Sequence, residues 1–489
     1  MPIRKLVLLL TIHLCKGTIH MQHHQQVIND AIGVDGPNIQ VKALDHSSTK
    51  HDENGFAFAA TFCPMDVPDK ECPQTLLVQL GDNNIQNPFD IQWAKRYIDE
   101  DGSKLIVHDM KQLSKSDPNF PGYLLCGRIE DPINHHKNGG FMMLVDNFGN
   151  FNKIEIYLRL IELRSVVEDE EGYFAVGTTE MYGIGGAGVA GAAMLSTDKG
   201  LQPICQKHIH GRFNNGDDTN EFNEVIRYND EFAMIGSTKK ANEEGCSEGN
   251  LSDVLYVRAT KDCTVICKRQ IGDGYIEKGA DVVSESGRSL TKHGNFVLVT
   301  GTRKVIDTSR CHTSSHDILF FSLSDSCDYY DGFHIDVDGF DDSGSSIVYN
   351  ESTDRVYIGG ETEKTMNNFP LENDLFIMEF QGRHFKKFER FGGFRHENSD
   401  VHLTFSDAGV VMMGHTESYM SNRQDAYLIE RYPHVEMTCG DIELQPAIKS
   451  LVLEDKDAFE AMWWHPESYP YEVTSQNIGL DQALLCEKF

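Results

Sequence analysis

The sequence has little positive charge and, beyond its first residues, no long apolar run. Its 489 residues include 44 Lys and Arg against 75 Asp and Glu, which gives a formal net charge of −31. A surface this acidic repels the phosphates of nucleic acids and of anionic lipids, so neither is an expected partner. No internal stretch approaches the roughly 20 apolar residues that a membrane-spanning helix requires, so we expect no membrane span.

Sequence motifs for nucleotide or zinc chemistry are also lacking. No His-Glu-x-x-His motif occurs, and the pair His208 and His210 has no third ligand in view. Gly183–Gly188 has the glycine spacing of a dinucleotide fingerprint, but a predicted strand follows it where that fingerprint requires a helix. We therefore interpret this stretch as a flexible loop, interpret the two histidines as an exposed pair, and expect no nucleotide cofactor.

The N-terminus is typical of a secretory signal peptide. Arg4 and Lys5 precede an apolar run from Leu6 to Leu14, and the small residues of Cys15–Gly17 suit cleavage. The alternative is a buried N-terminal strand. The sequence thus predicts a signal peptide over 1–17, a flexible segment over 18–38, and a secreted, extracellular mature protein.

The cysteines fit an oxidising compartment. Removal of Cys15 with the signal would leave 11 of the 12 cysteines. Candidate disulfides in such a compartment are Cys63–Cys72, Cys311–Cys327 and Cys439–Cys486. Cys263 and Cys267 lie roughly 13 Å apart along one predicted strand, which is too far for them to pair with each other. Cys126, inside an apolar strand, is the candidate free and buried thiol.

Self-similarity is the strongest pattern in the sequence. A turn residue, an alternating apolar strand, a glycine and often a threonine recur seven times. The copies are Gly55–Thr61, Gly122–Gly127, Gly172–Thr179, Asp230–Thr238, Gly294–Thr302, Asp354–Thr362 and Ala408–Thr416. In the first copy Ala60 replaces the glycine.

A second apolar unit, often opened by aspartate, follows each copy of the first. Its copies are Thr75–Leu80, Gly140–Val145, Ala192–Ser196, Asp253–Arg258, Asp317–Leu323, Asp374–Phe380 and Asp425–Arg431. From Ala60 to Gly414 the mean period is about 59 residues, which leaves room for four short strands in each repeat. β-Solenoids have shorter periods, and a string of sandwiches would not repeat two motifs in order. The sequence therefore predicts an all-β, seven-bladed β-propeller of four-stranded blades over 39–432.

The two repeated units resemble a diverse family of secreted propeller repeats with a glycine–aromatic–apolar–glycine–threonine signature followed by aspartate–aromatic–leucine. The resemblance covers roughly residues 50–432. It implies the same architecture and no particular chemistry, because that family has none in common.

The chain ends are expected to complete and cover the ring. A strand near Ile39–Lys42 is predicted to complete the last blade. Residues 433–489 lie outside the repeat and form a predicted C-terminal extension packed on the propeller. Within it, Asp457–Trp464 has the pattern of a short amphipathic helix. The aromatic run His465–Tyr471 would pack beside it, with a platform for a sugar ring as the alternative.

Ligand sites of propellers lie around the central channel, and two sets of loops open there on one face. The loops between the second and third strands are long and irregular, which is typical of functional loops on a rigid scaffold. The loops between blades are acidic, and clustered oxygen donors are what Ca²⁺ requires. The candidate calcium ligands are Asp217, Asp218, Asp281, Asp338, Asp341, Asp342 and Asp400. The alternative is that these acids only form turns beside glycine.

Two functions remain open. In the first, the protein is a secreted binding or structural propeller that recognises a protein or glycan through its long-loop face. In the second, it is a secreted enzyme, such as a calcium-dependent hydrolase, with its site at the channel mouth. Glycosylation sequons begin at Asn250 and Asn350 and fit a secreted glycoprotein. The lack of a polar motif repeated in every blade favours binding, whereas the acidic loops favour the enzyme.

Overall fold

We describe the fold from a computed structural model of the chain. The structure describes residues 23–29, 38–47, 55–63, 74–81, 90–99, 103–114, 122–131, 138–182, 188–211, 219–240, 251–272, 282–307, 312–337, 341–364, 372–382, 384–391, 397–405, 409–416, 425–431, 447–450, 454–456, 459–464, 469–471, 473–477 and 481–486. Within this part of the chain, no helix is long and apolar enough to cross a bilayer.

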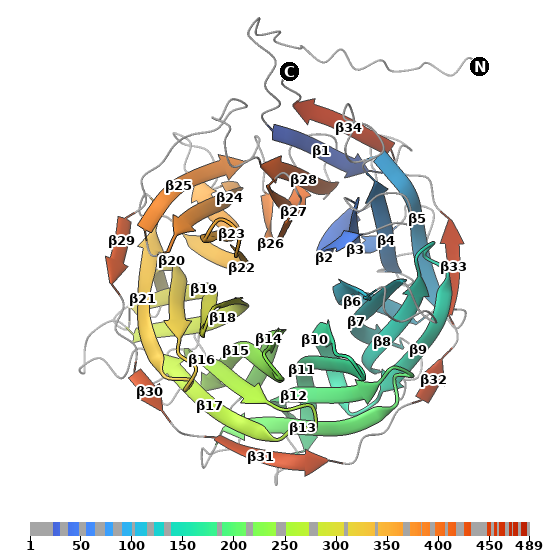
Figure 1. Cartoon of the computed structure of the whole chain (residues 1–489), viewed down its shortest axis with the longest axis horizontal. Helices are drawn as coiled ribbons and strands as arrows, with labels where there is room; N and C mark the ends of the chain where they lie inside the picture. Colours follow the sequence, from blue (N-terminus) through green and yellow to red (C-terminus); the bar gives the residue numbers. More distant parts are fainter. Residues whose placement is uncertain are drawn as a thin grey trace, which may run out of the picture.

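Seven antiparallel sheets are arranged around a central axis, as Figure 1 shows. Blades 1 to 3 are β2(Asn38–Ser47) β3(Gly55–Cys63) β4(Gln74–Gly81) β5(Asp90–Asp99); β6(Lys104–Gln112) β7(Gly122–Glu130) β8(Gly139–Asp146) β9(Phe151–Tyr157); and β10(Leu160–Glu168) β11(Gly172–Tyr182) β12(Gly188–Asp198) β13(Pro203–Gly211). Blades 4 and 5 are β14(Thr219–Tyr228) β15(Glu231–Lys240) β16(Leu251–Ala259) β17(Val265–Gly272), and β18(Val282–His293) β19(Phe296–Asp307) β20(His312–Leu323) β21(Tyr329–Asp336). Blade 6 is β22(Asp342–Asn350) β23(Arg355–Lys364) β24(Glu372–Gln381) β25(His384–Phe391), and blade 7 begins with β26(Glu397–Phe405) β27(Val410–Thr416) β28(Asp425–Arg431). The predicted seven-bladed propeller is confirmed.

The hydrophobic core is divided among the interfaces between blades. The described residues form seven buried apolar clusters, and each joins neighbouring blades. Between blades 3 and 4, for example, the rings of Phe174 and Phe232 stack with centroids 4.2 Å apart. The third strand of a blade is covered on both faces, which explains why the second repeated unit is continuously apolar: β4 is buried at every position. The fourth strand is half exposed, as in β25.

The last blade is completed by a different strand from the one we predicted. Residues 39–42 belong to β2, the innermost strand of blade 1. The fourth strand of blade 7 is instead β1(His23–Asn29), which pairs antiparallel with β28. It lies within the segment that we expected to be flexible. Propeller closure requires only a free strand edge and a segment that reaches it, so residues upstream of the first repeat can fill this place.

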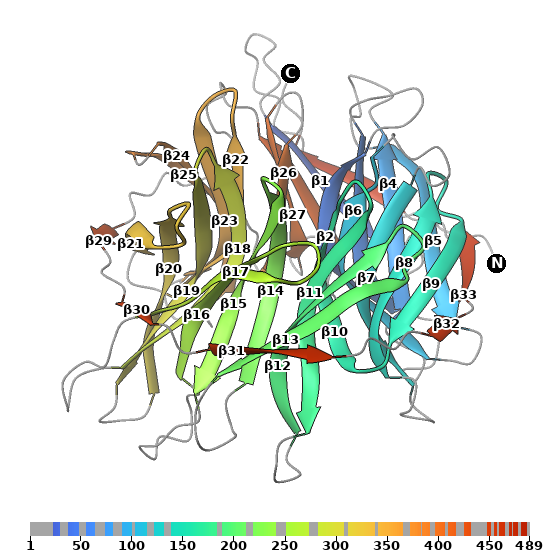
Figure 2. The ribbon, with the colours of Figure 1, turned by 60° about the horizontal axis from the view of Figure 1, so that its bottom comes forward.

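The C-terminal extension adds a fifth strand to six of the seven sheets. In chain order, β29(Ala447–Ser450), β30(Glu454–Lys456), β31(Phe459–Trp464), β32(Tyr469–Tyr471), β33(Val473–Asn477) and β34(Asp481–Cys486) pair with the outer strands of blades 5, 4, 3, 2, 1 and 7. Figure 2 shows β31 lying across the outside of blade 3. The helix predicted over residues 457–464 is therefore wrong: the open edge of β13 pairs with β31 and overrides the helical pattern.

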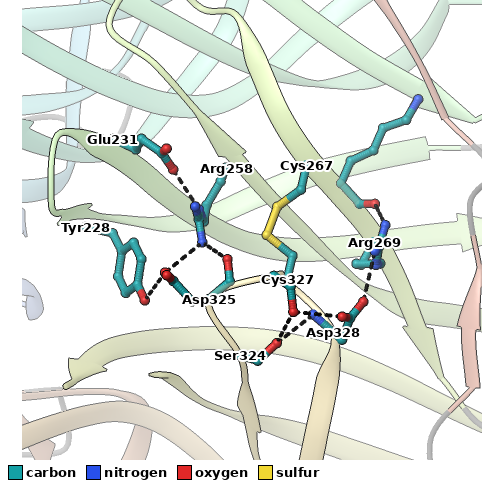
Figure 3. The surroundings of a disulfide bond; sticks show 11 residues. Tyr228, Glu231, Arg258, Cys267, Arg269, Ser324, Asp325, Cys327 and Asp328 are labelled. Carbon is teal, nitrogen blue, oxygen red and sulfur yellow. Dashed lines mark hydrogen bonds and ion pairs between the residues drawn. A yellow bond between two sulfur atoms is a disulfide. The ribbon is translucent and has the colours of Figure 1, made fainter. Parts of the chain in front are cut away.

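Two disulfides link consecutive blades in equivalent places. Cys205 in β13 bonds Cys263 in the turn after β16, and Cys267 in β17 bonds Cys327 in the turn after β20. The predicted Cys311–Cys327 pair is therefore wrong. Each turn cysteine has positive φ, 58° at Cys263 and 67° at Cys327, and this turn meets the outer strand of the preceding blade. Figure 3 shows the second bond beside Arg258 and Asp325.

Candidate functional site

The site that the fold defines is the central channel, and irregularities in the innermost strands shape it. In every blade, the register between the first and second strands shifts near the middle of the first strand. Such a β-bulge adds one unpaired residue and re-aims its side chain. The residues in the bulges that also line the channel are Lys42, His108, Arg164, Asn223, Arg288, Ser345 and, within a wider irregularity, Asp400 and Val401.

The repeated glycine of the sequence faces these bulges. A Cβ at Gly236 would lie 1.9 Å from the carbonyl oxygen of Glu221, and one at Gly301 would lie 1.9 Å from that of Ser286. The glycines of blades 2, 3 and 6, at 127, 177 and 360, have equivalent contacts of 1.9 to 2.1 Å. In these five blades the glycine leaves room for the bulge, and the bulge delivers a polar residue to the channel; in blade 1 the bulge lies opposite Ala60.

The residue after the bulge connects each blade to the next. The N–H of Val166 donates to the Asp109 carboxylate at 2.9 Å, and the N–H of Val225 donates to Ser165 Oγ at 3.3 Å. The same contact recurs three more times, with acceptors Glu224, Ser289 and Ser346 and donors Leu290, Ile347 and Leu403. Blade 1 has Ala43 at this position, which has no acceptor to offer. The channel wall is thus a continuous hydrogen-bonded belt from blade 2 to blade 7.

The channel encloses about 410 Å³ and is lined by residues from all seven innermost strands. Val401 is the one apolar side chain among the described lining residues. A polar cavity of this size suits a ligand with many hydrogen-bonding groups.

One sector of the channel is a compact network of ion pairs around Glu162. Its carboxylate lies 2.5 Å from Arg164 Nε and 3.2 Å from His108 Nε2. Arg164 also contacts Glu221 at 2.9 Å and donates to Asn223 Oδ1 at 2.6 Å. Burial opposes ionisation of Glu162, but the hydrogen bond from His108 and the charge of Arg164 outweigh it and hold its pKa well below the usual range. These charges are therefore already compensated.

A second sector joins blade 7 to blade 1. Asp400 forms an ion pair with Lys42. Removal from bulk water raises the pKa of Asp400, but the Lys42 ammonium outweighs this and lowers it to about 2. Nearby, burial lowers the pKa of His402 and of His415 to about 4, so both rings are neutral at physiological pH. Asp400 is consequently ionised and held in place.

The pKa of Glu361, which also lines the channel, shifts in the direction opposite to that of Asp400. Burial raises its pKa to about 7, and the negative charge of Asp400 adds to that rise, while a hydrogen bond from Asn373 and the positive charges of Arg288 and His316 oppose it. Two carboxyl groups of one cavity therefore titrate far apart, one protonated near neutral pH and one ionised. Such a separation is typical of acid and base partners in hydrolytic sites.

The structure describes three of the seven predicted calcium ligands, and one of the three lines the channel. Asp400 lines the channel, while Asp341 accepts from the ring of His316 at 2.8 Å. Asp342 is buried and accepts from the N–H of Val337 at 2.6 Å. Asp217, Asp218, Asp281 and Asp338 lie outside the described residues. Among those that the structure does describe, no three His, Cys, Asp or Glu residues gather as a metal site would require, and Ca²⁺ binding stays a prediction.

Other sequence features have mixed outcomes. Cys126 is free and buried, as predicted, whereas His208, predicted to be exposed, is buried at 7% exposure. Gly183–Gly188 lies largely outside the described residues, as do most of the long loops and the pairs Cys63–Cys72 and Cys439–Cys486. Residues 245–249 read Gly-x-Ser-x-Gly, the spacing of a nucleophile elbow. They fall between the antiparallel strands β15 and β16, whereas a nucleophile elbow requires a strand followed by a helix.

Apart from Asp400, the channel residues were not predicted from the sequence. The predicted sites lie in loops, whereas Arg164, Arg288 and Glu361 lie within strands. The signal was present, since the bulge residue precedes each repeated glycine by about 13–19 residues in blades 2 to 6. Because these residues differ in type from blade to blade, they form no repeated polar motif.

The chain is thus a seven-bladed β-propeller with a polar channel. No family model and no curated protein matches its sequence. Solved structures with a similar fold include Penicillium chrysogenum α-L-arabinanase complexed with arabinobiose (10% identity, TM-score 0.41, covering 85% of this chain and 100% of that one). Others are the polysaccharide lyase Uly1 (7%, 0.39, 85% and 99%) and Bombyx mori GH32 β-fructofuranosidase (10%, 0.31, 92% and 94%). Similarity at this level carries no argument about chemistry.

Proposed function

We propose that this chain is a secreted binding propeller that holds a glycan in its central channel. The observation that carries the proposal is the ring of bulges, which presents a different polar side chain from each blade to one cavity. Sugars need many hydrogen-bond donors and acceptors in fixed positions, and the rigid strands supply them. A cavity of about 410 Å³ suits one or two sugar units better than a folded protein partner.

Secretion is supported by the two disulfides, because such bonds persist in oxidising compartments. The signal peptide over 1–17 remains part of the proposal. N-terminal sequencing of the natural protein tests it: a mature chain that begins at Met1 would contradict secretion through this signal.

The binding proposal is tested on a glycan array, followed by calorimetry with the sugars that bind. Ser345→Trp places a bulky ring in the channel and should abolish binding. Ser326→Trp, in the exposed turn between β20 and β21, is the matched control and should bind normally. Equal binding by both variants would place the ligand elsewhere, and capture of a protein partner by both would favour recognition through the loops.

A second candidate is a glycan-cleaving enzyme, and the specific observation in its favour is the Glu361 and Asp400 pair. A protonated carboxyl can donate a proton to a leaving oxygen, and an ionised one can stabilise positive charge on the sugar or activate water. The test is release of reducing ends from a panel of polysaccharides. Release by the wild type that is lost in both Glu361→Gln and Asp400→Asn would establish this function. Binding without turnover would leave glycan binding as the function.

A Ca²⁺ ion at the channel face is compatible with either of these functions. We expect EDTA to lower the melting temperature and added Ca²⁺ to restore it. An unchanged melting curve would leave the predicted aspartates as solvated turn residues.

A further inference from the structure

We propose that Arg288 is an anion-binding subsite of the channel and holds a carboxylate or sulfate group of an acidic glycan. This inference rests on the proposed glycan-binding function, since it names the class of sugar that the channel selects. Arg288 lines the cavity, makes no ion pair with a described side chain, and lies between uncharged residues at the adjacent bulge positions, although the carboxyls of Glu224 and Glu361 line the same cavity.

Arg288 enters the channel because of the bulge in β18. The register with β19 shifts between Gly287 and Ser289, which leaves Arg288 unpaired in the sheet. Its side chain is exposed and lines the cavity. The backbone beside it is fixed, because Asn223 Nδ2 donates to the Gly287 carbonyl at 2.7 Å and Ile347 N–H donates to Ser289 Oγ at 3.1 Å.

The other cations at bulge positions are compensated, and Arg288 is not. Lys42 pairs with Asp400, and Arg164 pairs with Glu162 and Glu221. Arg288 makes no ion pair or hydrogen bond with any side chain in the described part of the chain. Glu361 shares the cavity and is influenced by the charge of Arg288, yet the two form no ion pair.

The adjacent bulge positions carry no charge. Blade 4 presents Asn223, whose amide is used by Arg164 and the Gly287 carbonyl, and blade 6 presents Ser345. Ser343 and Ser346 also line the cavity, and Ser346 Oγ accepts the N–H of Leu403. A guanidinium in a cavity that also holds hydroxyl groups matches an oxyanion on a sugar, because it donates two parallel hydrogen bonds to carboxylate or sulfate.

The charge of the whole protein makes this arrangement selective. A net charge of −31 repels free anions from the surface, so a single uncompensated cation in the channel gains little from random ions. A glycan with one acidic group brings its own hydrogen-bonding surface and can occupy the remainder of the cavity. The expected ligand therefore carries few acidic groups rather than a dense row of them.

The test is calorimetric titration of the full chain with three disaccharide probes: galacturonosyl-galactose, a monosulfated galactobiose, and neutral galactobiose. The two acidic probes distinguish carboxylate from sulfate recognition. Arg288→Gln should weaken the affinity for the preferred acidic probe by about tenfold or more, since a hydrogen-bonded charge is lost. It should leave the neutral probe unchanged. Arg288→Lys keeps the charge without the planar fork and should give an intermediate loss.

The matched control is Lys386→Gln, which removes one positive charge from an exposed position on the outer strand β25. It should bind all three probes like the wild type. Equal weakening of acidic and neutral probes by Arg288→Gln, or equal weakening by both glutamine variants, would overturn the anion subsite.

If no sugar binds, inorganic sulfate separates the two proposals. Thermal melts of wild type and Arg288→Gln are compared at increasing sulfate and at constant ionic strength. Greater stabilisation of the wild type would support the anion subsite and count against the glycan function. Equal stabilisation of both proteins would overturn the subsite as well.

Discussion

At the scale of single residues, the channel combines fixed charges with two carboxyl groups that can change, Glu361 and Glu224, since burial raises the pKa of each to about 7. Asp400 and Glu162 are ionised through their partners Lys42, His108 and Arg164. Glu361 differs, because its pKa of about 7 lies at physiological pH. Below that pH it is neutral and leaves Arg288 uncompensated. Above it, the carboxylate adds a negative charge to the cavity, which repels an acidic ligand.

We therefore predict that acidic glycans bind more weakly as pH rises from 6 to 8, by about 3- to 10-fold. The groups that set this titration besides burial are Asn373, Asp400, Arg288 and His316. Calorimetry at both pH values and constant ionic strength measures the effect. Glu361→Gln should remove part of the pH dependence and leave the remainder, which is due to Glu224, because burial raises the pKa of Glu224 to about 7 as well. An affinity that rises with pH would contradict the assignment.

The repeated glycine provides a second prediction for a single residue. Gly301→Ala would place a Cβ 1.9 Å from the carbonyl of Ser286, beside the bulge that carries Arg288. We expect a loss of about 1–3 kcal/mol in the free energy of unfolding, measured with denaturant. Gly200→Ala is the control, since its nearest neighbour is the side-chain oxygen of Asp198 at 3.2 Å. Equal stability of the two variants would show that the bulge can relax.

At the scale of elements, the outer turns fasten each blade to its neighbour. Tyr97 and Tyr157 donate to the carbonyls of Gly149 and Leu201, each at 2.8 Å, at the first two interfaces between blades. At the next two interfaces the disulfides Cys205–Cys263 and Cys267–Cys327 take this role. The same positive-φ turn position is used in all four, at Gly149, Leu201, Cys263 and Cys327. Covalent and hydrogen-bonded contacts thus serve one geometric purpose.

Removal of either disulfide should destabilise the ring at one interface. We expect the double variant Cys205→Ala with Cys263→Ala to lose about 2–4 kcal/mol in unfolding free energy, because the bond closes a long loop. Denaturant titration measures this loss. Peptide mapping without reduction checks the connectivity, and a linked peptide that joins residues 311 and 327 would contradict it.

At the scale of the whole molecule, both chain ends complete the outside of the ring. The N-terminal strand β1 closes blade 7, and the C-terminal strands β29 to β34 cover the outer edges of six sheets. Open sheet edges pair readily with other chains, so this covering protects against aggregation. Among the described residues, the channel lining comes from the innermost strands and from Glu361 in β23, and it includes no residue of the extension.

Truncation after residue 446 should therefore affect stability and solubility more than ligand binding. We predict association detectable by light scattering and a melting temperature lower by about 5 °C or more. Truncation after residue 478, which removes only β34, should have a smaller effect. A shortened chain that stays monomeric and equally stable would show that the outer edges need no cover.

The sequence by itself determined the number of blades and the strand pattern of each repeat. These depend on contacts within one repeat, where apolar residues must alternate or run continuously. The tertiary structure decided what depends on neighbours far along the chain. It paired Cys327 with Cys267 rather than Cys311, placed β1 rather than residues 39–42 in the last blade, and made residues 459–464 a strand. It also placed a carboxylate in contact with Lys42 and with Arg164, whereas no described carboxylate contacts Arg288. Charges from different blades meet only when the ring closes.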